Sequence, residues 1–502
     1  MALRTVGPVR DLDSGVSPVK FRRTALLVAP LSLLWLSLPA AATNAAPQWH
    51  AAKVASLPTG ATGLPNGFLP ALSCSSAGNC SAGGAFSDGA GNVEGLVLNE
   101  TNGVWKAPVR LLPPSGANKD PSLSINSLSC ASAGNCAAVG SFADAHSNGQ
   151  SLVANEVRGV WQQAQKVTLP TGAAANVQNS QIHSVDCWSP GNCSAIGSYL
   201  DGTLPTGYEQ GLEVNEVRGV WGPARETRLP ATANADPYAV INQVACTHAG
   251  NCVAVGSYIS QDNATEGLLI TELDGAWKSA ATVVLPGDAS AYPSAALSEV
   301  TCASTNNCTA LGTYTNVAGD IEGLTVSETH AAWARAVAMV MPSGAATNPR
   351  TFFYGYGGLT CPSVGNCSAG GQYLVGTSSY EGFFINEVDG QWQSATELAL
   401  PAGSQMAGKN GGVVAVSCRS AGNCSAGAAY IDGANAYQAL VVNEVAGQWR
   451  TGQKITLPTG NNTVGVDGGV YGLICHASGP CTATGSYLKT LTNYAGFTVT
   501  TS

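Results

Sequence analysis

The chain has few charged residues and no excess of basic ones. Charged side chains make up 11% of its 502 residues, and 22 lysines and arginines stand against 31 aspartates and glutamates, which gives a formal charge of −9. A protein that binds phosphate backbones or anionic lipid needs a cluster of positive charge. Nucleic acid and anionic membranes are therefore not expected as partners.

Familiar catalytic motifs are also missing. The sequence contains no His-Glu-x-x-His, no phosphate-binding loop and no Gly-x-Ser-x-Gly, the patterns that place metal ligands, phosphate-binding amides or a serine nucleophile. No catalytic residues are assigned, and neither a cofactor nor a metal is expected. Sequence patterns consequently say more about the shape of this protein than about its activity.

The N-terminal segment has the organisation of an export signal. Lys20, Arg22 and Arg23 precede an apolar stretch at 25–38, which is followed by small residues. We expect residues 1–45 to be the signal, cleaved near 42–46, and residues 46–502 to form one extracellular domain without a membrane span. An uncleaved anchor and a start downstream of Met1 are the alternatives, although the stretch is short for a spanning helix.

Sixteen cysteines form eight Cys-x5-Cys pairs that recur every 56 to 59 residues, and no cysteine lies outside the pattern. Such a period is typical of a repeat protein. Export favours disulfides; zinc is the alternative, but the spacing is wide for a zinc knuckle and no histidine recurs with the pairs. The predicted disulfides are Cys74-Cys80, Cys130-Cys136, Cys187-Cys193, Cys246-Cys252, Cys302-Cys308, Cys361-Cys367, Cys418-Cys424 and Cys475-Cys481.

Each repeat has the pattern of a four-stranded meander. In the second repeat, strands are expected at 124–130, 136–142 and 151–157, and a fourth strand carries Trp161 and ends near residue 170. A two-residue turn, Arg158-Gly159, joins the last two strands. Its register places Glu156 opposite Trp161, and we interpret this recurring Glu/Trp pair as cross-strand packing rather than catalysis.

The repeats are expected to close into a ring. Small residues fill the second strand and tryptophan marks the fourth, which suits a sheet that is crowded near an axis and splayed outward. The sequence ends with a third strand near Phe497, and Trp49 belongs to a fourth strand that lacks the first three. The N-terminal strand should therefore complete the last sheet, giving an all-β, eight-bladed β-propeller of four-stranded antiparallel blades.

The repeated pattern Ser-Leu-Ser-Cys, Gly-Asn-Cys-x-Ala-x-Gly-Ser-Tyr and Asn-Glu-x-x-Gly-x-Trp covers nearly the whole chain after residue 46. It resembles secreted bacterial β-propellers of the BNR/Asp-box and WD-repeat-like group, which implies architecture more than activity, because such propellers serve as lectins, scaffolds and hydrolases. Most of the turns lack the aspartate of an Asp-box, although Asp274 and Asp389 precede Gly-x-Trp. The arginine triad with a Tyr/Glu pair of sialidases is not evident. The Gly-x-Trp element is also similar to one in eight-bladed pyrroloquinoline-quinone dehydrogenases, but their vicinal disulfide has no counterpart here.

Candidate binding residues are those on the longer loops and those that break the repeat. The segment before Cys361 is longer than its counterparts and carries Arg350, Phe352, Phe353, Tyr354 and Tyr356, either an interaction patch or a hydrophobic plug over a blade junction. An aromatic residue ends every second strand, which favours packing over a set of shelves for sugars: Phe86, Phe142, Tyr199, Tyr258, Tyr314, Tyr373, Tyr430 and Tyr487.

A second group of candidates lies on the first strands, close to the expected axis. These side chains could hold water or an ion in an axial channel, or could simply be solvated. They are Asn126, His183, Asn242, Gln243 and Glu299.

Two functions remain open. The first is an exported, non-catalytic binding or scaffold propeller that engages a glycan, a cell-wall polymer or a protein through the longer loops, as a monomer. The second is an extracellular polysaccharide hydrolase or lyase, which would need acidic, histidine or tyrosine groups converging on one pocket in some blades only. Aspartates recur at the start of several long loops, which indicates a role in the turns: Asp88, Asp144, Asp201 and Asp432.

Overall fold

The computed structural model describes residues 46–62, 69–174, 179–202, 208–355, 357–404, 411–458, 468–490 and 493–502. The chain divides into two units, residues 1–43 and 44–502, and all of the described residues belong to the second. The predicted export signal therefore lies outside the described residues. Within the described ranges, no helix is long and apolar enough to cross a membrane.

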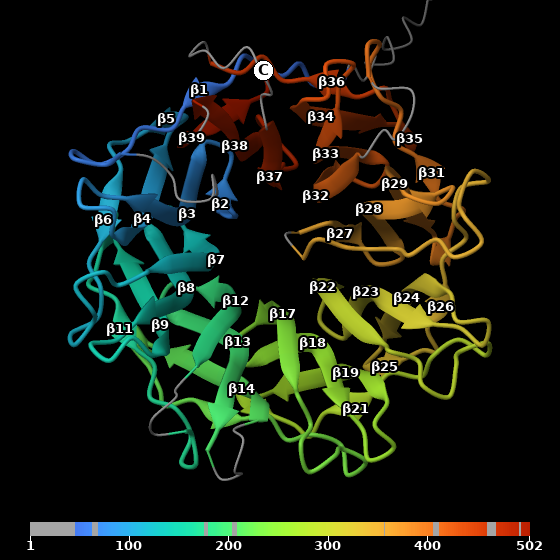
Figure 1. The fold of residues 1–502 in the computed structure, drawn as a ribbon, viewed down its shortest axis with the longest axis horizontal. Coiled ribbons are helices and arrows are strands. Elements are labelled where there is room, and N and C mark those ends of the chain that lie inside the picture. The colour runs from blue at the N-terminus through green and yellow to red at the C-terminus, as the bar shows by residue number, and fades with distance from the viewer. Residues whose placement is uncertain are drawn as a thin grey trace, which may run out of the picture. The chain divides into compact units, whose positions relative to one another are not determined.

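Eight antiparallel sheets follow one another around a ring (Figure 1). In seven sheets the strands run in chain order from the centre outward, and in the eighth the outermost strand is the N-terminal one. Each sheet contains one of the eight predicted disulfides, and no free cysteine remains among the described residues. The prediction of an eight-bladed propeller with one disulfide per blade is confirmed. We number the blades 1 to 8, beginning with the blade of β2.

The innermost strands surround the axis: β2 (Ala71–Ser76), β7 (Ser124–Ser132), β12 (Ser180–Ser189), β17 (Val240–His248), β22 (Ala296–Ser304), β27 (Leu359–Ser363), β32 (Gly412–Ser420) and β37 (Gly468–Ile474). The second strands are β3 (Asn79–Ser87), β8 (Asn135–Ala143), β13 (Asn192–Asp201), β18 (Asn251–Ile259), β23 (Asn307–Thr315), β28 (Asn366–Val375), β33 (Asn423–Ile431) and β38 (Thr482–Thr490). The third strands are β4 (Val93–Thr101), β9 (Gly149–Val157), β14 (Tyr208–Val217), β19 (Thr265–Leu273), β24 (Ile321–Thr329), β29 (Ser379–Val388), β34 (Tyr437–Val445) and β39 (Asn493–Thr500).

The outermost strand differs from the single strand that the sequence predicts, because it consists of two short segments. In blade 2 the segment with Trp161 ends at once, and Ala164 N donates to Leu112 O of the preceding blade before pairing with β9 resumes. The first segments are β5 (Val104–Trp105), β10 (Val160–Trp161), β15 (Val220–Trp221), β20 (Ala276–Trp277), β25 (Ala332–Trp333), β30 (Gln391–Trp392) and β35 (Gln448–Trp449). The second segments are β6 (Val109–Leu111), β11 (Gln165–Lys166), β16 (Arg225–Glu226), β21 (Ala281–Thr282), β26 (Val337–Ala338), β31 (Thr396–Glu397) and β36 (Gln453–Lys454).

The N-terminal strand closes the ring as predicted. Strand β1 (Lys53–Val54) pairs antiparallel with β39, with Lys53 opposite Thr498, and Trp49 forms a bridge with Thr501. Blade 8 is thus built from both ends of the second unit, and its outer edge is paired rather than open.

Two kinds of turn share one face of the ring, which we call the short-turn face. In six blades the glycine of the turn between third and fourth strands donates its N–H to the glycine carbonyl of the disulfide turn, at 2.8 Å from Gly159 to Gly134; in blade 5, Ala331 N donates to Asn306 O at 3.1 Å. A Cβ on Gly134 would lie 2.7 Å from Gly159 N, so a larger residue would separate the turns. The longer loops project from the opposite, long-loop face.

The aromatic residues that end the second strands belong to the core. All eight are between 0% and 3% exposed, and the hydrophobic clusters that contain them extend from each blade into the next. They are therefore unavailable as shelves for a ligand.

Candidate binding site at the channel mouth

A β-bulge marks the same position in six innermost strands, four residues before the first cysteine of the pair. A bulge adds one residue to a strand and changes the direction of its side chain. The bulged residues include three of the predicted channel residues. The full set is Asn126, His183, Asn242, Ser298, Val414 and Tyr471.

The polar bulged residues connect neighbouring blades. Asn126 Nδ2 donates to Ile182 O at 3.0 Å, and Asn242 Nδ2 donates to Leu297 O at 2.8 Å. His183 Nδ1 lies 2.8 Å from Ile241 O, which can only accept, so this nitrogen carries the proton. Burial lowers the pKa of His183. Each of these side chains therefore joins its own blade to the next.

Other side chains of the innermost strands accept backbone N–H groups from the next blade. Gln243 Oε1 accepts from Val300 N at 2.6 Å, and Asp186 Oδ2 accepts from Cys246 N at 2.7 Å. Burial raises the pKa of Asp186. The carboxylate of Asp186 thus serves the contact between blades 3 and 4 and is not a convergent catalytic group.

These strands enclose an axial cavity of about 380 Å³, which is lined by residues from all eight blades. Asn126, His183, Asn242 and Gln243 are brought together on its wall. Glu299 is not; it is fully buried and accepts from Gly355 N at 3.2 Å. Burial raises the pKa of Glu299 to about 7. Its role is to hold the backbone that precedes β27.

Blade 6 replaces the simple bulge with a longer one. Phe352 bridges to Gln372 and Leu359 pairs with Ala369, so six residues lie between these two pairs. In blade 2 the equivalent pairs begin at Ser124 and Leu128, with three residues between them. The unusual length seen in the sequence is therefore an expanded bulge, and Figure 1 shows the segment before β27 reaching toward the centre of the ring.

The expanded bulge separates the predicted aromatic cluster into buried and accessible members. Phe353 is 5% exposed and packs against Phe383, whereas Phe352 is 49% exposed and meets the ring of Tyr354 edge-on at 5.3 Å. Tyr354 Oη donates to Gln372 Oε1 at 2.6 Å. Tyr356 lies outside the described residues.

Two tyrosines from the neighbouring blades complete this surface. Burial, together with the nearby hydroxyls of Tyr437 and Tyr471, raises the pKa of Tyr354 to about 12. Tyr437 begins β34 and is 43% exposed, and Tyr471 occupies the bulge of β37. Sequence reasoning missed both, although the bulge position was available for Tyr471. We call Phe352, Tyr354, Tyr437 and Tyr471 the aromatic rim.

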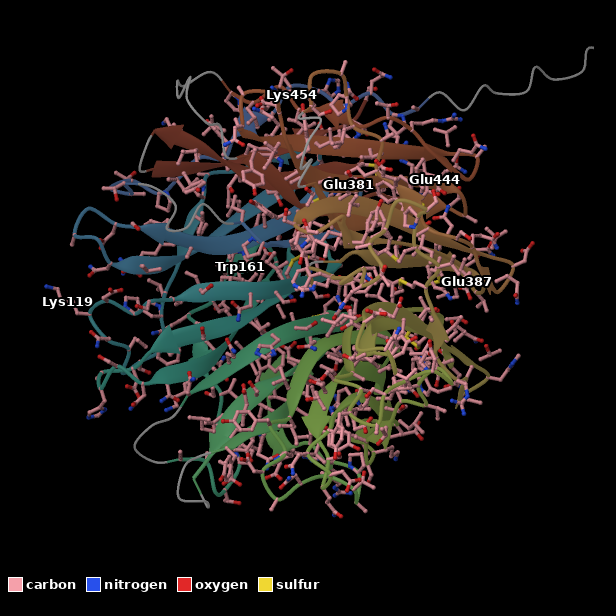
Figure 2. The ribbon with its side chains drawn as sticks, turned by 45° about the vertical axis from the view of Figure 1, so that its right-hand side comes forward. Lys119, Trp161, Glu381, Glu387, Glu444 and Lys454 are labelled. Carbon is pink, nitrogen blue, oxygen red and sulfur yellow. A yellow bond between two sulfur atoms is a disulfide. The ribbon has the colours of Figure 1, made fainter. Side chains whose placement is uncertain are left out.

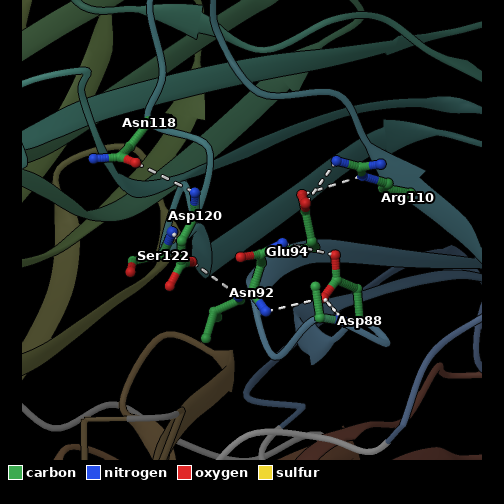
Figure 3. A network of polar contacts seen from close by, with 9 residues as sticks. Asp88, Asn92, Glu94, Arg110, Asn118, Asp120 and Ser122 are labelled. Carbon is green, nitrogen blue, oxygen red and sulfur yellow. Dashed lines mark hydrogen bonds and ion pairs between the residues drawn. The ribbon is translucent and has the colours of Figure 1, made fainter.

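Arg350 lies just before the rim on a loop whose backbone recurs from blade to blade. Its φ of 41° is matched by 42° at Ser122. In both loops a side-chain oxygen two residues upstream accepts two backbone N–H groups. Asp120 Oδ1 accepts from Val93 N at 3.0 Å and from Ser122 N at 3.1 Å (Figure 3), and Asn348 Oδ1 does the same in blade 6. The backbone at Arg350 is therefore fixed by the repeat, and its exposed side chain is particular to blade 6.

Three of the aspartates that begin long loops, Asp88, Asp144 and Asp432, have the turn role that the sequence indicates. Asp88 Oδ1 accepts from Ala90 N at 2.8 Å and Asn92 N at 2.9 Å (Figure 3). Asp144 and Asp432 make the same contacts in their own loops. Hydrogen bonds from Asn92 lower the pKa of Asp88. These carboxylates hold the long loops and do not converge on a pocket.

The described residues bring one group of potential metal ligands together, namely Cys418, Cys424 and Glu444. Both cysteines are joined in a disulfide, and disulfide sulfurs are not thiolate ligands. This group therefore does not form a metal site.

The fold and its axial channel define an eight-bladed β-propeller with one disulfide in each blade. No protein-family model and no curated protein sequence matches the chain. Solved structures with a similar fold include an ulvan lyase of polysaccharide lyase family PL25 (9% identity, TM-score 0.44, covering 82% of this chain and 100% of that one) and a puromycin-hydrolyzing peptidase of Mycobacterium tuberculosis (10%, 0.42, 88% and 61%). Trypanosoma rangeli sialidase is similar at 9% identity and a TM-score of 0.33, covering 67% of this chain and 55% of the sialidase. At these values the likeness concerns the fold alone.

Proposed function

We propose that the protein is an exported, non-catalytic binding propeller that engages an uncharged glycan chain at the aromatic rim on the long-loop face. The observation that carries this proposal is the clustering of Phe352, Tyr354, Tyr437 and Tyr471 from blades 6, 7 and 8, where Tyr354 directly precedes Gly355 on the wall of the axial cavity. The C–H bonds on the face of a sugar ring carry slight positive charge, which suits the negative face of an aromatic ring.

The surroundings of the rim favour binding over bond cleavage. Asp186 and Glu299 are occupied by backbone N–H groups, and a tyrosine with a pKa of about 12 is a poor base near neutral pH. The polar side chains of the channel wall are mainly neutral amides and hydroxyls, which can hydrogen-bond sugar hydroxyls. Eight disulfides suit an oxidising, extracellular location.

Binding of the purified, oxidised protein to an array of neutral, anionic and cationic glycans tests this function, with product analysis by chromatography run on the same glycans. We expect selective retention of neutral chains without cleavage. Turnover of a bound polysaccharide would replace the proposal with a hydrolase or lyase, and selective capture of a protein instead of a glycan would also contradict it.

The double variant Phe352→Ala, Tyr437→Ala identifies the surface used. We expect it to weaken glycan binding by about tenfold or more, since each ring contributes an apolar contact of roughly 1 kcal/mol. Tyr292→Ala is the matched control, because Tyr292 is 64% exposed but lies on the loop between blades 4 and 5, away from the rim. Equal binding by the two variants would exclude the rim.

A further inference from the structure

A recurring asparagine connects the outer parts of neighbouring blades. It stands immediately before the glutamate that recurs in the third strands, and we call it the junction asparagine. Asn155 of blade 2 donates through Nδ2 to Glu216 Oε1 at 2.5 Å and accepts from Trp221 Nε1 at 2.9 Å, both in blade 3. The tryptophan bond recurs from Trp161, Trp277, Trp449 and Trp49 to Asn99, Asn215, Asn386 and Asn443.

Three junctions have a smaller residue in this position: Thr271, Ser327 and Thr500. The indole N–H groups of Trp333, Trp392 and Trp105 are the ones that these residues would face, and all three are buried without a hydrogen-bond partner. Among the described tryptophans of the outermost strands, the indole N–H therefore lacks a partner wherever another residue replaces the junction asparagine. A buried donor without a partner costs roughly 1 to 3 kcal/mol.

The junction of blades 5 and 6 is distinguished by its space. A cavity of about 460 Å³ opens there on the short-turn face, compared with about 10 Å³ at the junction of blades 4 and 5 and about 200 Å³ at the junction of blades 2 and 3. Two small residues of β24, Thr325 and Ser327, line it. We call this space the junction cavity.

A comparison with the next junction, between blades 6 and 7, explains why the ring of Trp392 is accessible. Phe384 stands where blade 5 has Thr325, and it stacks on Trp449 with ring centroids 3.8 Å apart and planes at 7°. Thr325 is too small to cover an indole in this way, and Trp392 lines the junction cavity. A volume of this size falls within the range of about 300 to 1,000 Å³ of small-molecule sites.

The polar groups around the junction cavity include unsatisfied donors and acceptors. Glu387 is 6% exposed and Glu328 5%, and neither Oε2 has a hydrogen-bond partner; Trp392 Nε1 also has none. Figure 2 labels Glu387 and, on the next blade, Glu444, which accepts from the junction asparagine Asn386 at 2.5 Å. Burial raises the pKa of Glu387.

We propose that the junction cavity binds a single uncharged sugar ring, which stacks on Trp392 and hydrogen-bonds to the Glu387 carboxyl, the Trp392 indole N–H and the Ser327 hydroxyl. A pyranose offers an apolar C–H face and hydroxyls that donate and accept at once, which matches an indole face beside separate donors and acceptors. This site faces the short-turn side, so it is independent of the aromatic rim.

Titration of the oxidised protein with methyl glycosides, followed by tryptophan fluorescence and by ligand-observed NMR, tests the site. The probes are an uncharged hexoside, an amino sugar and a uronic acid. We expect saturable binding of the uncharged hexoside. Preference for either charged sugar, or no saturable binding of any, would overturn the proposal.

Ser327→Asn narrows the cavity without disrupting the fold, because it introduces the residue that five other junctions carry. We expect it to weaken hexoside binding by roughly tenfold or more while raising the melting temperature. Thr500→Asn is the matched control. It introduces asparagine at the equivalent position of the junction of blades 8 and 1 and should leave binding unchanged. Undiminished binding by Ser327→Asn would show that the sugar binds elsewhere or that the cavity holds only water.

Discussion

The junction of blades 2 and 3 and the junction of blades 5 and 6 are built from equivalent strands, but Val153 and Asn155 of the first are replaced by Thr325 and Ser327 in the second. At the first, Asn155 satisfies both Glu216 and Trp221 of the next blade. At the second, Ser327 is too short to reach the equivalent pair, and the cavity between the blades is larger, about 460 Å³ against about 200 Å³. Because each blade of a repeat protein contacts only its neighbours, one junction can be opened while the others keep the ring closed.

The largest effect is expected when the satisfied junction is converted into an unsatisfied one. Asn155→Ala removes two hydrogen bonds and leaves a buried carboxyl and a buried indole N–H unpaired, so we expect a loss of about 2 to 4 kcal/mol of unfolding free energy. Ser327→Ala, the matched change at the open junction, should cost less than about 0.5 kcal/mol. Guanidinium unfolding with intact disulfides measures both. Equal losses would mean that the asparagine does not hold the blades together.

The glutamates at the junctions should make stability depend on pH. Burial raises the pKa of Glu156 to about 7, and it raises the pKa of the equivalent glutamates in six other blades. Between the ordinary value of 4.5 and about 7, the folded protein binds more protons than the unfolded chain, so stability falls as pH rises. We expect the melting temperature to drop by roughly 5 °C between pH 5 and pH 7.5.

The variant Glu156→Gln tests whether the junctions cause this dependence, since glutamine keeps the shape but does not titrate. The slope of melting temperature against pH should become shallower than in the unmodified protein. Asp88 provides the control. Its pKa is lowered, so its contribution to the free energy of unfolding is lost only as pH falls below about 4, outside this window. An unchanged slope in Glu156→Gln would place the effect elsewhere.

A smaller gain is expected when the open junction is closed. Ser327→Asn places an amide group beside Glu387 and Trp392. Glu387 Oε2 and Trp392 Nε1 are both buried without a hydrogen-bond partner. We expect about 1 kcal/mol of stabilisation, visible as a higher melting temperature. A decrease would show that the cavity walls cannot accommodate the larger side chain and that the two junctions differ in backbone as well as in residue.

The repeated parts of the structure could be predicted from the sequence, whereas the site required the coordinates. Disulfides, the Glu156/Trp161 register and closure by Trp49 follow from spacing alone, because each is a short-range or repeated feature. The sequence marks the segment around Tyr354 as unusual but cannot show that Phe353 points into the core. Contacts between blades, which decide what lines a cavity, join residues about 57 positions apart.

The junction asparagine illustrates this limit. The motif Asn-Glu recurs visibly in the sequence, but its bonds run to the following blade, so its role is invisible within one repeat. Substitution by Thr271 or Ser327 looks like ordinary variation between repeats. Only the coordinates show that the junction with Thr271 has a cavity of about 10 Å³ and the junction with Ser327 a cavity of about 460 Å³.

The smallest expected effect concerns the simple bulge of blade 5, which Gln243 of blade 4 holds, and the expanded bulge of blade 6, which Glu299 of blade 5 holds. Gln243 holds one backbone N–H of the next blade, that of Val300, whereas Glu299 accepts from Gly355 and also interacts with the amides of Gly358 and Leu359. A glutamine in place of Glu299 would offer a single acceptor oxygen and turn an N–H₂ group toward backbone N–H donors. We therefore expect Glu299→Gln to speed amide exchange at 355–359 several-fold.

Hydrogen exchange followed by mass spectrometry measures this change peptide by peptide. Exchange at Val300 should remain as slow as before, because its acceptor, Gln243, is untouched. The overall melting temperature should fall only slightly, since the segment lies at the channel mouth and the blade behind it is held by its own sheet and disulfide. If exchange at 355–359 did not change, the carboxylate would not be what orders the segment, and the position of Tyr354 in the aromatic rim would have to depend on its bond to Gln372 instead.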